Sequence, residues 1–286
     1  MGLTSVQAKG RIKNIASKNG ADPRVLMRIY MMERFLERVS LSDYKDNFII
    51  KGGMLITSMV GISMRSTMDI DTTVKGQDLS IENAQRIVSE IAEIKLDDGI
   101  SFTIKDVETI MDEMGYPGIR FHLDAVFEKM VTPIKIDAST GDVITPREIE
   151  YNYKLMLEER EIELWSYNLE TILGEKLQTI LVRERANTRM RDFYDICVLV
   201  EMYAGEIKAE DFKAAYEATC RKRESLHLIS NEEEIIHIIE SDSKLNNQWT
   251  NYQKKFSYAS DISFDKTIEC VKRLLSLLEF DAALEV

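Results

Sequence analysis

The stretch FIIKGGMLITSMVGISMRSTMDIDTTV, residues 48–74, decides the fold of the N-terminal half of the chain. It begins as an apolar strand, meets two glycines, continues as an apolar run and ends in alternating apolar and acidic residues. The expected elements are a strand, a glycine turn, a helix and a strand: residues 47–51, Gly52-Gly53, residues 54–60 and residues 68–74. This order is typical of an α/β fold.

Two features of this stretch predict its chemistry. Gly52 and Gly53 leave backbone N–H groups exposed at a helix start, where the partial positive charge favours an anion such as a triphosphate. Alternation along a strand places Asp69 and Asp71 on the same face. Two carboxylates so close repel each other unless a cation lies between them, and Mg²⁺ accepts carboxylate and phosphate oxygens together. The pattern therefore predicts metal-assisted nucleotidyl transfer. In the alternative, the glycines form only a turn and the aspartates only cap a surface strand.

A third carboxylate on a neighbouring strand would complete such a site. Asp137, in IKIDAST, ends an apolar strand in the right region, and Asp124, in FHLDAVF, is its competitor. We favour Asp137, because a position at a strand end opens toward a cleft.

A second chemistry is compatible with part of the same stretch. DIDTT, residues 69–73, also fits the DxDx[TV] signature of haloacid dehalogenase-type phosphohydrolases, in which the first Asp is a nucleophile. That fold requires a buried apolar strand that runs directly into the motif, whereas Arg65-Ser66-Thr67 precede it here. It also gives the glycine pair no role, so we rank this alternative lower.

Apolar periodicity extends the prediction along the chain. Amphipathic helices are expected over residues 23–39 and after Ser80. Alternating pieces between residues 100 and 137 predict short strands, with a turn at Tyr116-Pro117-Gly118.

After Pro146 the pattern is helical to the end of the chain. We therefore predict an α/β (α+β) protein with two domains. Residues 1–150 would form a nucleotidyltransferase-type mixed sheet flanked by helices, and residues 151–286 a helical bundle.

Composition limits the classes of partner. The chain has 286 residues, 44% of them hydrophobic, and a formal net charge of -12. No apolar run approaches the roughly 18 residues that span a bilayer, and the first residues lack the apolar core of a signal peptide. The three cysteines are widely spaced, so we expect a reducing cytoplasm. The acidic balance repels phosphate backbones on average, and nucleic acid would have to bind at local basic clusters.

The segment RERANTRMR, residues 183–191, is one such cluster. We predict that it binds RNA in a salt-dependent way through Arg183, Arg185, Arg189 and Arg191. The alternative is a solvated helix face.

Lys176 lies in the apolar stripe of a predicted helix, NLETILGEKLQTILVRERA. A buried charge needs a partner, and spacing leaves open whether this is a nucleotide phosphate or a nearby Glu. Asp192 and Asp195 lie three residues apart on one side of the next helix. They either pair with a local arginine or form a second acidic element that orients Lys176 or acts as a base.

These segments together resemble the AbiEii/AbiGii toxin family of minimal nucleotidyltransferases, part of the DNA polymerase β-like superfamily. The resemblance covers about residues 8–280. It rests on RFLERVSLSDYKDNFIIKGGMLI, RSTMDID, KIDASTGD, GEKLQTILVRERANTRMRDFYDI, ATCRKRE and NNQWTNYQKKFSY. The chain departs from the superfamily in having Gly52-Gly53 for a glycine–serine pair, and Thr67 where relatives often have Ser. Neither change removes a ligand.

The resemblance implies roles for the residues singled out above. A metal, Mg²⁺ or in second place Mn²⁺, would be bound by Asp69, Asp71 and Asp137. The catalytic set would be Asp69, Asp71, Lys176, Asp192 and Asp195. The nucleotide would contact Gly52, Gly53, Thr67 and Lys176, with Lys51 and Arg65 as the nearest cations of the α/β half.

The members of this family are toxins of toxin–antitoxin modules, some tied to abortive phage infection, and some relatives add nucleotides to tRNA ends. The resemblance implies a bacterial cytoplasmic enzyme that binds an NTP with Mg²⁺ and transfers nucleotides to tRNA or another RNA. It also implies an AbiEi-like antitoxin encoded alongside. The alternative within this class is an NTP-binding toxin that acts without nucleotidyl transfer.

Overall fold

The computed structural model describes residues 2–77, 80–111, 117–229 and 231–279. The chain forms two compact units. The first comprises Met1–Asp142 and Ile149–Ser166, and the second Val143–Glu148 and Tyr167–Val286. Among the helices of the described residues, none combines the length and the apolar character that a membrane span requires.

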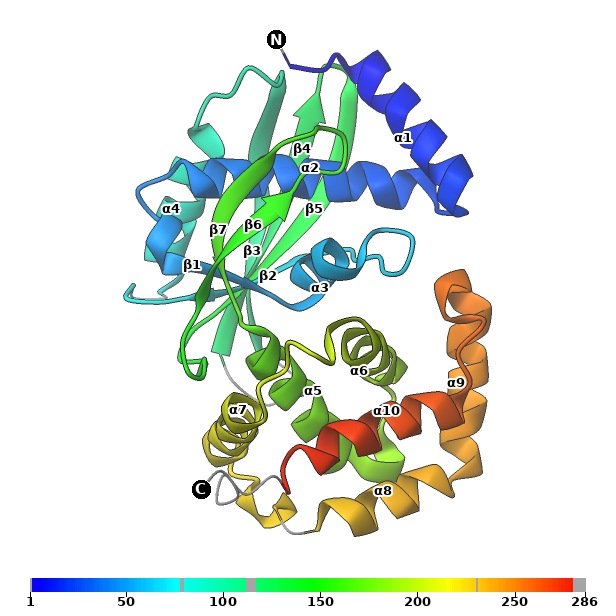
Figure 1. Cartoon of the computed structure of the whole chain (residues 1–286). Coiled ribbons are helices and arrows are strands. Elements are labelled where there is room, and N and C mark those ends of the chain that lie inside the picture. The colour runs from blue at the N-terminus through cyan, green and yellow to red at the C-terminus, as the bar shows by residue number, and fades with distance from the viewer. Residues whose placement is uncertain (1, 78–79, 112–116, 230, 280–286) are drawn as a thin grey trace. The chain divides into compact units, whose positions relative to one another are not determined.

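The first unit is a mixed seven-stranded sheet with helices (Figure 1). Its helices are α1 (Ser5–Asn19), α2 (Pro23–Ser40), η1 (Lys45–Asn47), α3 (Gly52–Val60) and α4 (Ile81–Glu93). Its strands are β1 (Phe48–Lys51), β2 (Ile70–Val74), β3 (Ile100–Met111), β4 (Pro117–Phe127), β5 (Met130–Ser139), β6 (Ile149–Lys154) and β7 (Glu161–Ser166). The strand order is β3-β4-β5-β2-β1-β7-β6.

The pairing around β2 brings distant parts of the sequence together. β2 runs antiparallel to β1 and parallel to β5, and Asp71 lies opposite Lys51 on one side and Asp137 on the other. On the far side of β5, Arg120 of β4 lies opposite Asp137. Four charged residues are thus consecutive across the sheet.

The helix α2 is buried along most of its length. It begins as expected, with Pro23 as its first residue and the Asp22 carboxylate accepting the N–H of Arg24 at 2.8 Å. Apolar residues of the predicted stripe, among them Leu26 and Leu36, are buried.

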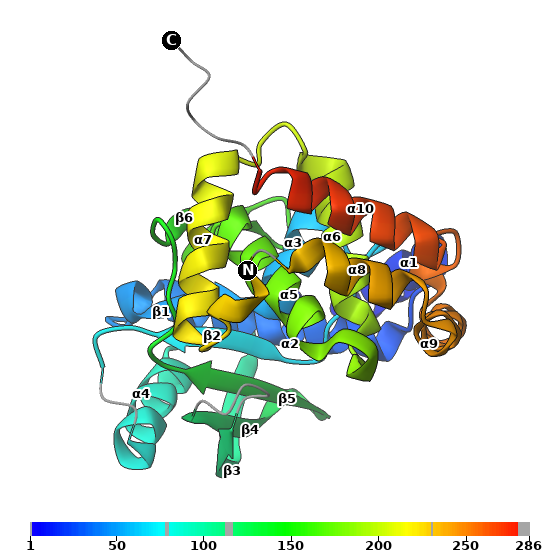
Figure 2. The ribbon, with the colours of Figure 1, turned by 90° about the horizontal axis from the view of Figure 1, so that it is seen from below.

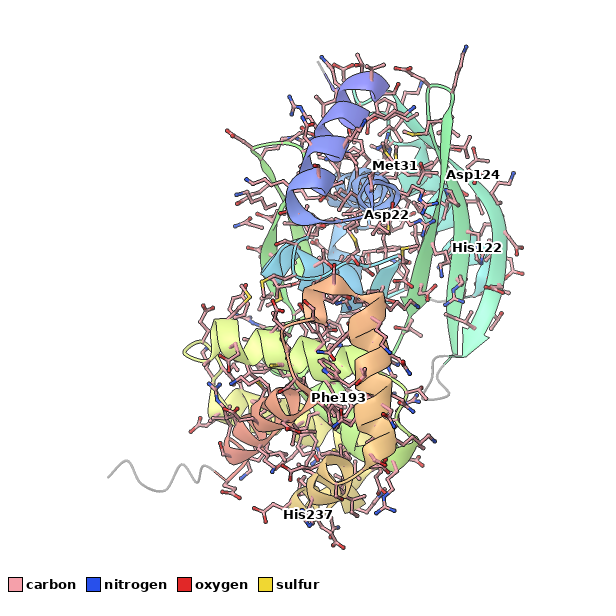
Figure 3. All side chains as sticks on the ribbon, turned by 90° about the vertical axis from the view of Figure 1, so that its right-hand side faces the viewer. Asp22, Met31, His122, Asp124, Phe193 and His237 are labelled. Carbon is pink, nitrogen blue, oxygen red and sulfur yellow. The ribbon has the colours of Figure 1, made fainter. Side chains whose placement is uncertain are left out.

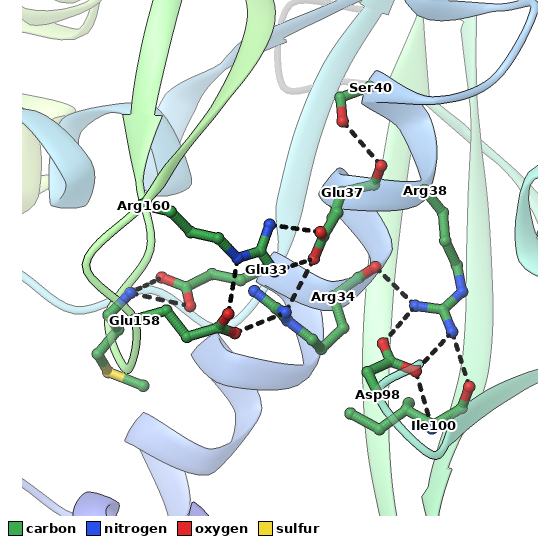
Figure 4. Close-up of polar contacts among 10 residues, drawn as sticks. Glu33, Arg34, Glu37, Arg38, Ser40, Asp98, Ile100, Glu158 and Arg160 are labelled. Atoms are coloured by element: carbon green, nitrogen blue, oxygen red, sulfur yellow. Dashed lines mark hydrogen bonds and ion pairs between the residues drawn. The ribbon is translucent and has the colours of Figure 1, made fainter. Parts of the chain in front are cut away.

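Charged residues of α2 connect it to the segment before β3 and to the β6–β7 hairpin (Figure 4). Arg38 donates to both carboxylate oxygens of Asp98, at 2.9 and 3.1 Å. Arg34 lies 2.9 Å from Glu158, and Arg160 donates to both oxygens of Glu37. Because buried charges are tolerated when they are paired, these contacts fix the helix against the sheet.

Glu33 of the same helix is buried and accepts the N–H of Met156 at 3.1 Å. Burial is the main cause that raises the pKa of Glu33 to about 8. This lies above the ordinary value of 4.5, so the folded chain holds the extra proton between about pH 4.5 and 8. The free energy of unfolding therefore decreases as the pH rises through that window, because the folded chain binds more protons at Glu33 than the unfolded chain does.

We expect Glu33→Gln to stabilise the protein at about pH 9 by on the order of 1 kcal/mol or more, and to have little effect at about pH 5. Denaturant unfolding of both chains at the two pH values measures this. An equal difference at both values would contradict the titration of Glu33.

The second unit is helical. Its helices are α5 (Leu169–Arg183), η2 (Glu184–Ala186), α6 (Met190–Tyr203), α7 (Ala209–Lys222), η3 (Leu226–Leu228), α8 (Glu232–Glu240), α9 (Ser243–Lys255), η4 (Ser257–Ala259) and α10 (Phe264–Ser276). α5 packs against both α6 and α7, and α10 packs on α6 (Figures 1 and 2). A Cβ on Gly174 would lie 3.1 Å from the backbone nitrogen of Tyr216, so the glycine permits the close approach of α5 and α7.

The structure confirms a mixed sheet with helices followed by a helical bundle, with one correction. The prediction of helix from Pro146 onward is wrong for residues 149–166, which form the antiparallel strands β6 and β7. These strands belong to the first compact unit, so the chain divides after Ser166 and at the short segment 143–148, rather than once near residue 150. Tyr116 of the predicted turn lies outside the described residues.

Candidate active site

The glycine pair closes tightly over the acidic stretch. Gly52 has a left-handed φ of +60°, and a Cβ there would lie 2.2 Å from Oδ2 of Asp71. A Cβ on Gly53 would lie 2.2 Å from Oγ1 of Thr67. Only glycine avoids both contacts, because the backbone turns at the point where the two side chains approach it.

The N–H of Gly53 donates to Oδ2 of Asp71 at 3.2 Å. The sequence predicted that the N–H groups of this turn bind a phosphate. In the structure, the N–H of Gly53 donates to a carboxylate of the protein. Asp69 precedes β2, which begins one residue later, and its Oδ1 accepts from Oγ1 of Thr67 at 3.1 Å. Thr67 and Arg65 are both buried below this turn.

Asp71 carries uncompensated negative charge. Burial raises its pKa above the ordinary range, and the charge of Asp69 and then that of Asp137 add to the effect. The N–H of Gly53 and the charge of Lys51 oppose it without reversing it. The surroundings of Asp71 therefore favour either a proton or a cation.

Asp137 is the acid beside Asp71, and it already has a partner. Arg120 donates from Nε and Nη2 to its two oxygens, at 2.7 Å each. Asp124 lies farther along β4, opposite Pro133 and 3.6 Å from Nζ of Lys105 (Figure 3). The register therefore brings Asp137, and not Asp124, next to the DxD stretch.

Asp142, which follows β5, is a further acid close to these strands. Its Oδ2 accepts from Lys51 at 2.6 Å, from Ser139 at 2.7 Å and from Thr73 at 2.5 Å. Burial opposes ionisation of Asp142, but these donors outweigh it and lower its pKa to about 2. Lys51 is thus engaged by a carboxylate within the first unit.

Asp69 and Asp71 fit an oxygen-preferring divalent cation, because two carboxylates supply the ligands it prefers and Lys135 approaches Asp69 only to 4.0 Å. Asp137 fits less directly, since Arg120 holds both its oxygens. Within the described part of the chain, no three His, Cys, Asp or Glu side chains already gather as a metal-binding group.

In the second unit, Lys176 bridges two aspartates of α6. Its Nζ lies 2.7 Å from Oδ1 of Asp192 and 2.8 Å from Oδ2 of Asp195, and Arg189 lies 2.9 Å from Oδ2 of Asp192. Lys176 is 14% exposed and the two aspartates 4% and 0%. Burial disfavours the charged form of Lys176, but the two carboxylates outweigh it and raise its pKa. Spacing left a phosphate or a Glu open as the partner of Lys176, and it offered Asp192 and Asp195 as an acidic element that orients the lysine; the contacts within this unit agree with the second of these.

The predicted arginine cluster does not form one patch. Arg185 lies in η2, 3.8 Å from Asp242, and Arg189 pairs with Asp192. Arg191 lies over the ring of Phe256, 5.2 Å from its centroid. Arg183 ends α5 and is partly buried.

The motif DIDTT is not preceded by a strand. Residues 65–69 form a connecting segment, and β2 starts at Ile70. A haloacid dehalogenase-type site requires a buried strand that runs directly into the motif, so the geometry does not support that alternative.

Three residues of this region were not predicted as site residues: Arg120, Ser139 and Asp142. The pairing of Arg120 with Asp137 could have been found by counting back along both strands from a hairpin turn at Glu128-Lys129. Local patterns could not indicate Asp142, because its donors come from β1, β2 and β5.

The space at Gly52 makes a direct prediction. Gly52→Ala adds a left-handed strain of about 1–2 kcal/mol to the overlap with Asp71, so we expect the first unit to lose stability by at least that amount. Gly10→Ala is the matched control, because nothing lies within 4 Å of its Cβ in α1. Urea unfolding of the three proteins measures the difference, and equal stability of both variants would contradict the close approach.

Comparisons with known proteins identify the family and the fold of the chain. The family described as "Nucleotidyl transferase AbiEii toxin, Type IV TA system" matches residues 34–285. The structure is similar to MenT4, a nucleotidyltransferase toxin from Mycobacterium tuberculosis, with a TM-score of 0.52 and 14% identity, over 97% of this chain and 99% of that chain. It is also similar to JHP933 from Helicobacter pylori, with a TM-score of 0.50 and 15% identity, over 90% and 94% of the two chains. No curated protein matches. At these identities the structural likeness concerns the fold alone.

Proposed function

The chain belongs to the AbiEii family of nucleotidyltransferase toxins of type IV toxin–antitoxin systems, and from this premise we propose that it transfers a nucleotide from an NTP to an RNA, with tRNA as the first candidate. The observation that carries the proposal is the fit of Gly52 and Gly53 around Asp71 and Thr67. An ordinary strand connection does not require a glycine turn pressed against the carboxylate of Asp71 and the hydroxyl of Thr67. Such a turn suits a site where phosphates, a cation and carboxylates meet.

Asp69 and Asp71 would hold a divalent cation, Mg²⁺ or in second place Mn²⁺, and Asp137 would join them when Arg120 releases it. When bound, this cation would neutralise phosphate charge and polarise the α-phosphate. Thr67 positions Asp69 through its hydroxyl. Arg65 and Lys51 are the cations nearest to the glycine turn.

In the transfer, a 3′-hydroxyl oxygen of the RNA forms a bond to the α-phosphorus of the NTP, and the bond from that phosphorus to the bridging oxygen breaks. Pyrophosphate leaves with the bonding electrons, and a base takes the hydroxyl proton. Lys176, Asp192 and Asp195, with Arg189, form a group of balanced charge in the second unit, and we assign Lys176 and the two aspartates to substrate binding there.

The family implies a cognate antitoxin, and we propose that it is of the AbiEi type and encoded beside the toxin. Activity in the bacterial cytoplasm and in defence against phage belongs to the same proposal.

Incubation of the protein with total RNA, Mg²⁺ and each α-labelled NTP tests the function. We expect label to enter RNA with at least one NTP and not without Mg²⁺. Binding of NTP without label in RNA would favour a toxin that acts by association, and would contradict transfer.

A further inference from the structure

The segment 243–260, which forms α9 and η4, has an unusual charge. It contains three lysines and no acidic residue, in a chain with 49 Asp and Glu against 37 Lys and Arg. The positive charge is therefore local to this part of the second unit. Because the rest of the chain is acidic, an anionic ligand would be directed to this surface rather than to the surface as a whole.

The face of α9 that carries this charge is exposed. Leu245, Trp249 and Tyr252 form the buried face of the helix. On the opposite side, an exposed stripe at spacings of three and four residues consists of Lys244, Asn247, Asn251 and Lys255. The asparagine amides both donate and accept hydrogen bonds, as nucleobase edges do. Figure 3 looks onto this helix from its uncovered side.

The stripe ends at an aromatic surface. Phe256 and Tyr258 are partly exposed, and their rings stack with centroids 5.4 Å apart and planes at 27°. The hydroxyl of Tyr258 lies 3.1 Å from that of Tyr252, which keeps the ring in place. Two cations approach the Phe256 ring: Arg191 at 5.2 Å and Lys255 at 5.4 Å from its centroid.

Helix capping explains only part of this arrangement. Lys254 and Lys255 lie in the last turn of α9, where cations interact favourably with the helix dipole. Arg191 comes from α6, so its position over Phe256 has no such cause. It also connects the aromatic surface to α6, where Tyr194 lies 4.9 Å from Tyr258 and the neighbouring Asp192 and Asp195 hold Lys176.

We propose that α9 and η4 form a docking surface for single-stranded RNA, with bases stacked at Phe256 and Tyr258 and phosphates at Arg191, Lys254 and Lys255. Aromatic rings with nearby cations in a basic strip are the features that bind unpaired nucleic acid without strict sequence preference. The proposal rests on the proposed function, because the docked strand would be the acceptor of the nucleotide.

The length and character of the surface favour RNA over other ligands. Lys244 and Lys255 lie eleven residues apart on one helix, which corresponds to about 16 Å, more than a single nucleotide covers. An acidic protein partner would be expected to bury an apolar patch, whereas the exposed stripe of α9 consists of lysines and amides.

The test measures binding of a fluorescent, mixed-sequence, single-stranded oligoribonucleotide to the full chain by anisotropy, at several salt concentrations. Phe256→Leu should weaken binding by about tenfold or more, because one base–aromatic stack is lost. Lys254→Gln/Lys255→Gln should weaken it and reduce the slope of log affinity against log salt by about 1.4. Lys208→Gln is the control, because Lys208 is an exposed lysine that precedes α7. This variant should bind RNA as the wild type does.

The lysine variant alters only exposed side chains, so it keeps the test valid if Phe256→Leu unfolds the unit. Unchanged affinity in the lysine variant would overturn the proposal. Two other results for the lysine variant would also overturn it. One is a loss of affinity for a free NTP equal to the loss for RNA, and the other is a loss of antitoxin binding with RNA affinity retained. The proposed function fails separately, if the wild type binds RNA as predicted here and transfers no label to it.

Discussion

Asp71→Asn is expected to abolish transfer of label to RNA while the first unit stays folded. Asp71 lies opposite Asp137 in the sheet, and burial, followed by the charges of Asp69 and Asp137, raises its pKa, so its charge is retained at a cost to stability. The amide keeps an acceptor for the N–H of Gly53 but cannot ligate a cation as a carboxylate does, or take a proton. Loss of several kcal/mol of transition-state stabilisation corresponds to about a thousandfold or more in rate.

The melting temperature separates this effect from unfolding. Because the substitution removes a partly buried negative charge beside two others, we expect the melting temperature to stay the same or to rise. Asp124→Asn is the matched control, since Asp124 lies on β4, which β5 separates from β2, and pairs with Lys105 at 3.6 Å. Full activity of Asp71→Asn, or an equal loss in Asp124→Asn, would contradict the assignment of the site.

Lys176→Met is expected to destabilise the second unit by about 3–5 kcal/mol, because it removes the cation that lies within 2.8 Å of both buried carboxylates, Asp192 and Asp195. From spacing alone, Lys176 could be a lysine that binds a phosphate. Removal of such a lysine would leave the protein without bound nucleotide intact. The ion pairs reverse that expectation. Loss of activity in this variant therefore has to be compared with its stability.

Lys272→Met is the control for Lys176→Met. Lys272 also lies 2.8 Å from a carboxylate, that of Glu240, but it is 51% exposed, so its removal should cost less than about 1 kcal/mol. Urea unfolding in a Trp165→Phe background, followed by the fluorescence of the buried Trp249, reports on the second unit. Equal midpoints for both variants would show that the Lys176 ion pairs do not stabilise the unit.

Local sequence patterns could predict the part of the site that lies within one continuous stretch of the chain, residues 48–74. The strand, the helix and the second strand of residues 48–74 follow from apolar runs and are present, with Gly52-Gly53 as the start of α3. The prediction that Asp69 and Asp71 share one strand is wrong, because β2 begins at Ile70 and Asp69 precedes it. The pairing of Asp71 with Lys51 and Asp137 depends on the strand order, which brings β5 beside β2 across more than sixty residues. Local periodicity carries no information on such an order.

The hairpin of β6 and β7 was missed for a different reason. Its segment is rich in Glu, Leu and Met, which favour helices, and this composition concealed the alternation of buried Ile162 and Leu164 with exposed residues. The partner of Lys51, Asp142, was missed because it lies outside β1, whereas Asp192 and Asp195 had been named as one possible acidic element beside Lys176. Spacing could indicate that Lys176 needs a partner, but not which of the open alternatives provides it.

The most direct test of the proposed transfer compares α-labelled and γ-labelled NTP in the same reaction with RNA and Mg²⁺. We predict that the α-label enters RNA, that the γ-label appears as pyrophosphate in equal amount, and that Asp71→Asn yields neither. Release of the γ-label as inorganic phosphate, with no α-label in RNA, would contradict nucleotidyl transfer at the Gly52-Gly53 and Asp69–Asp71 site.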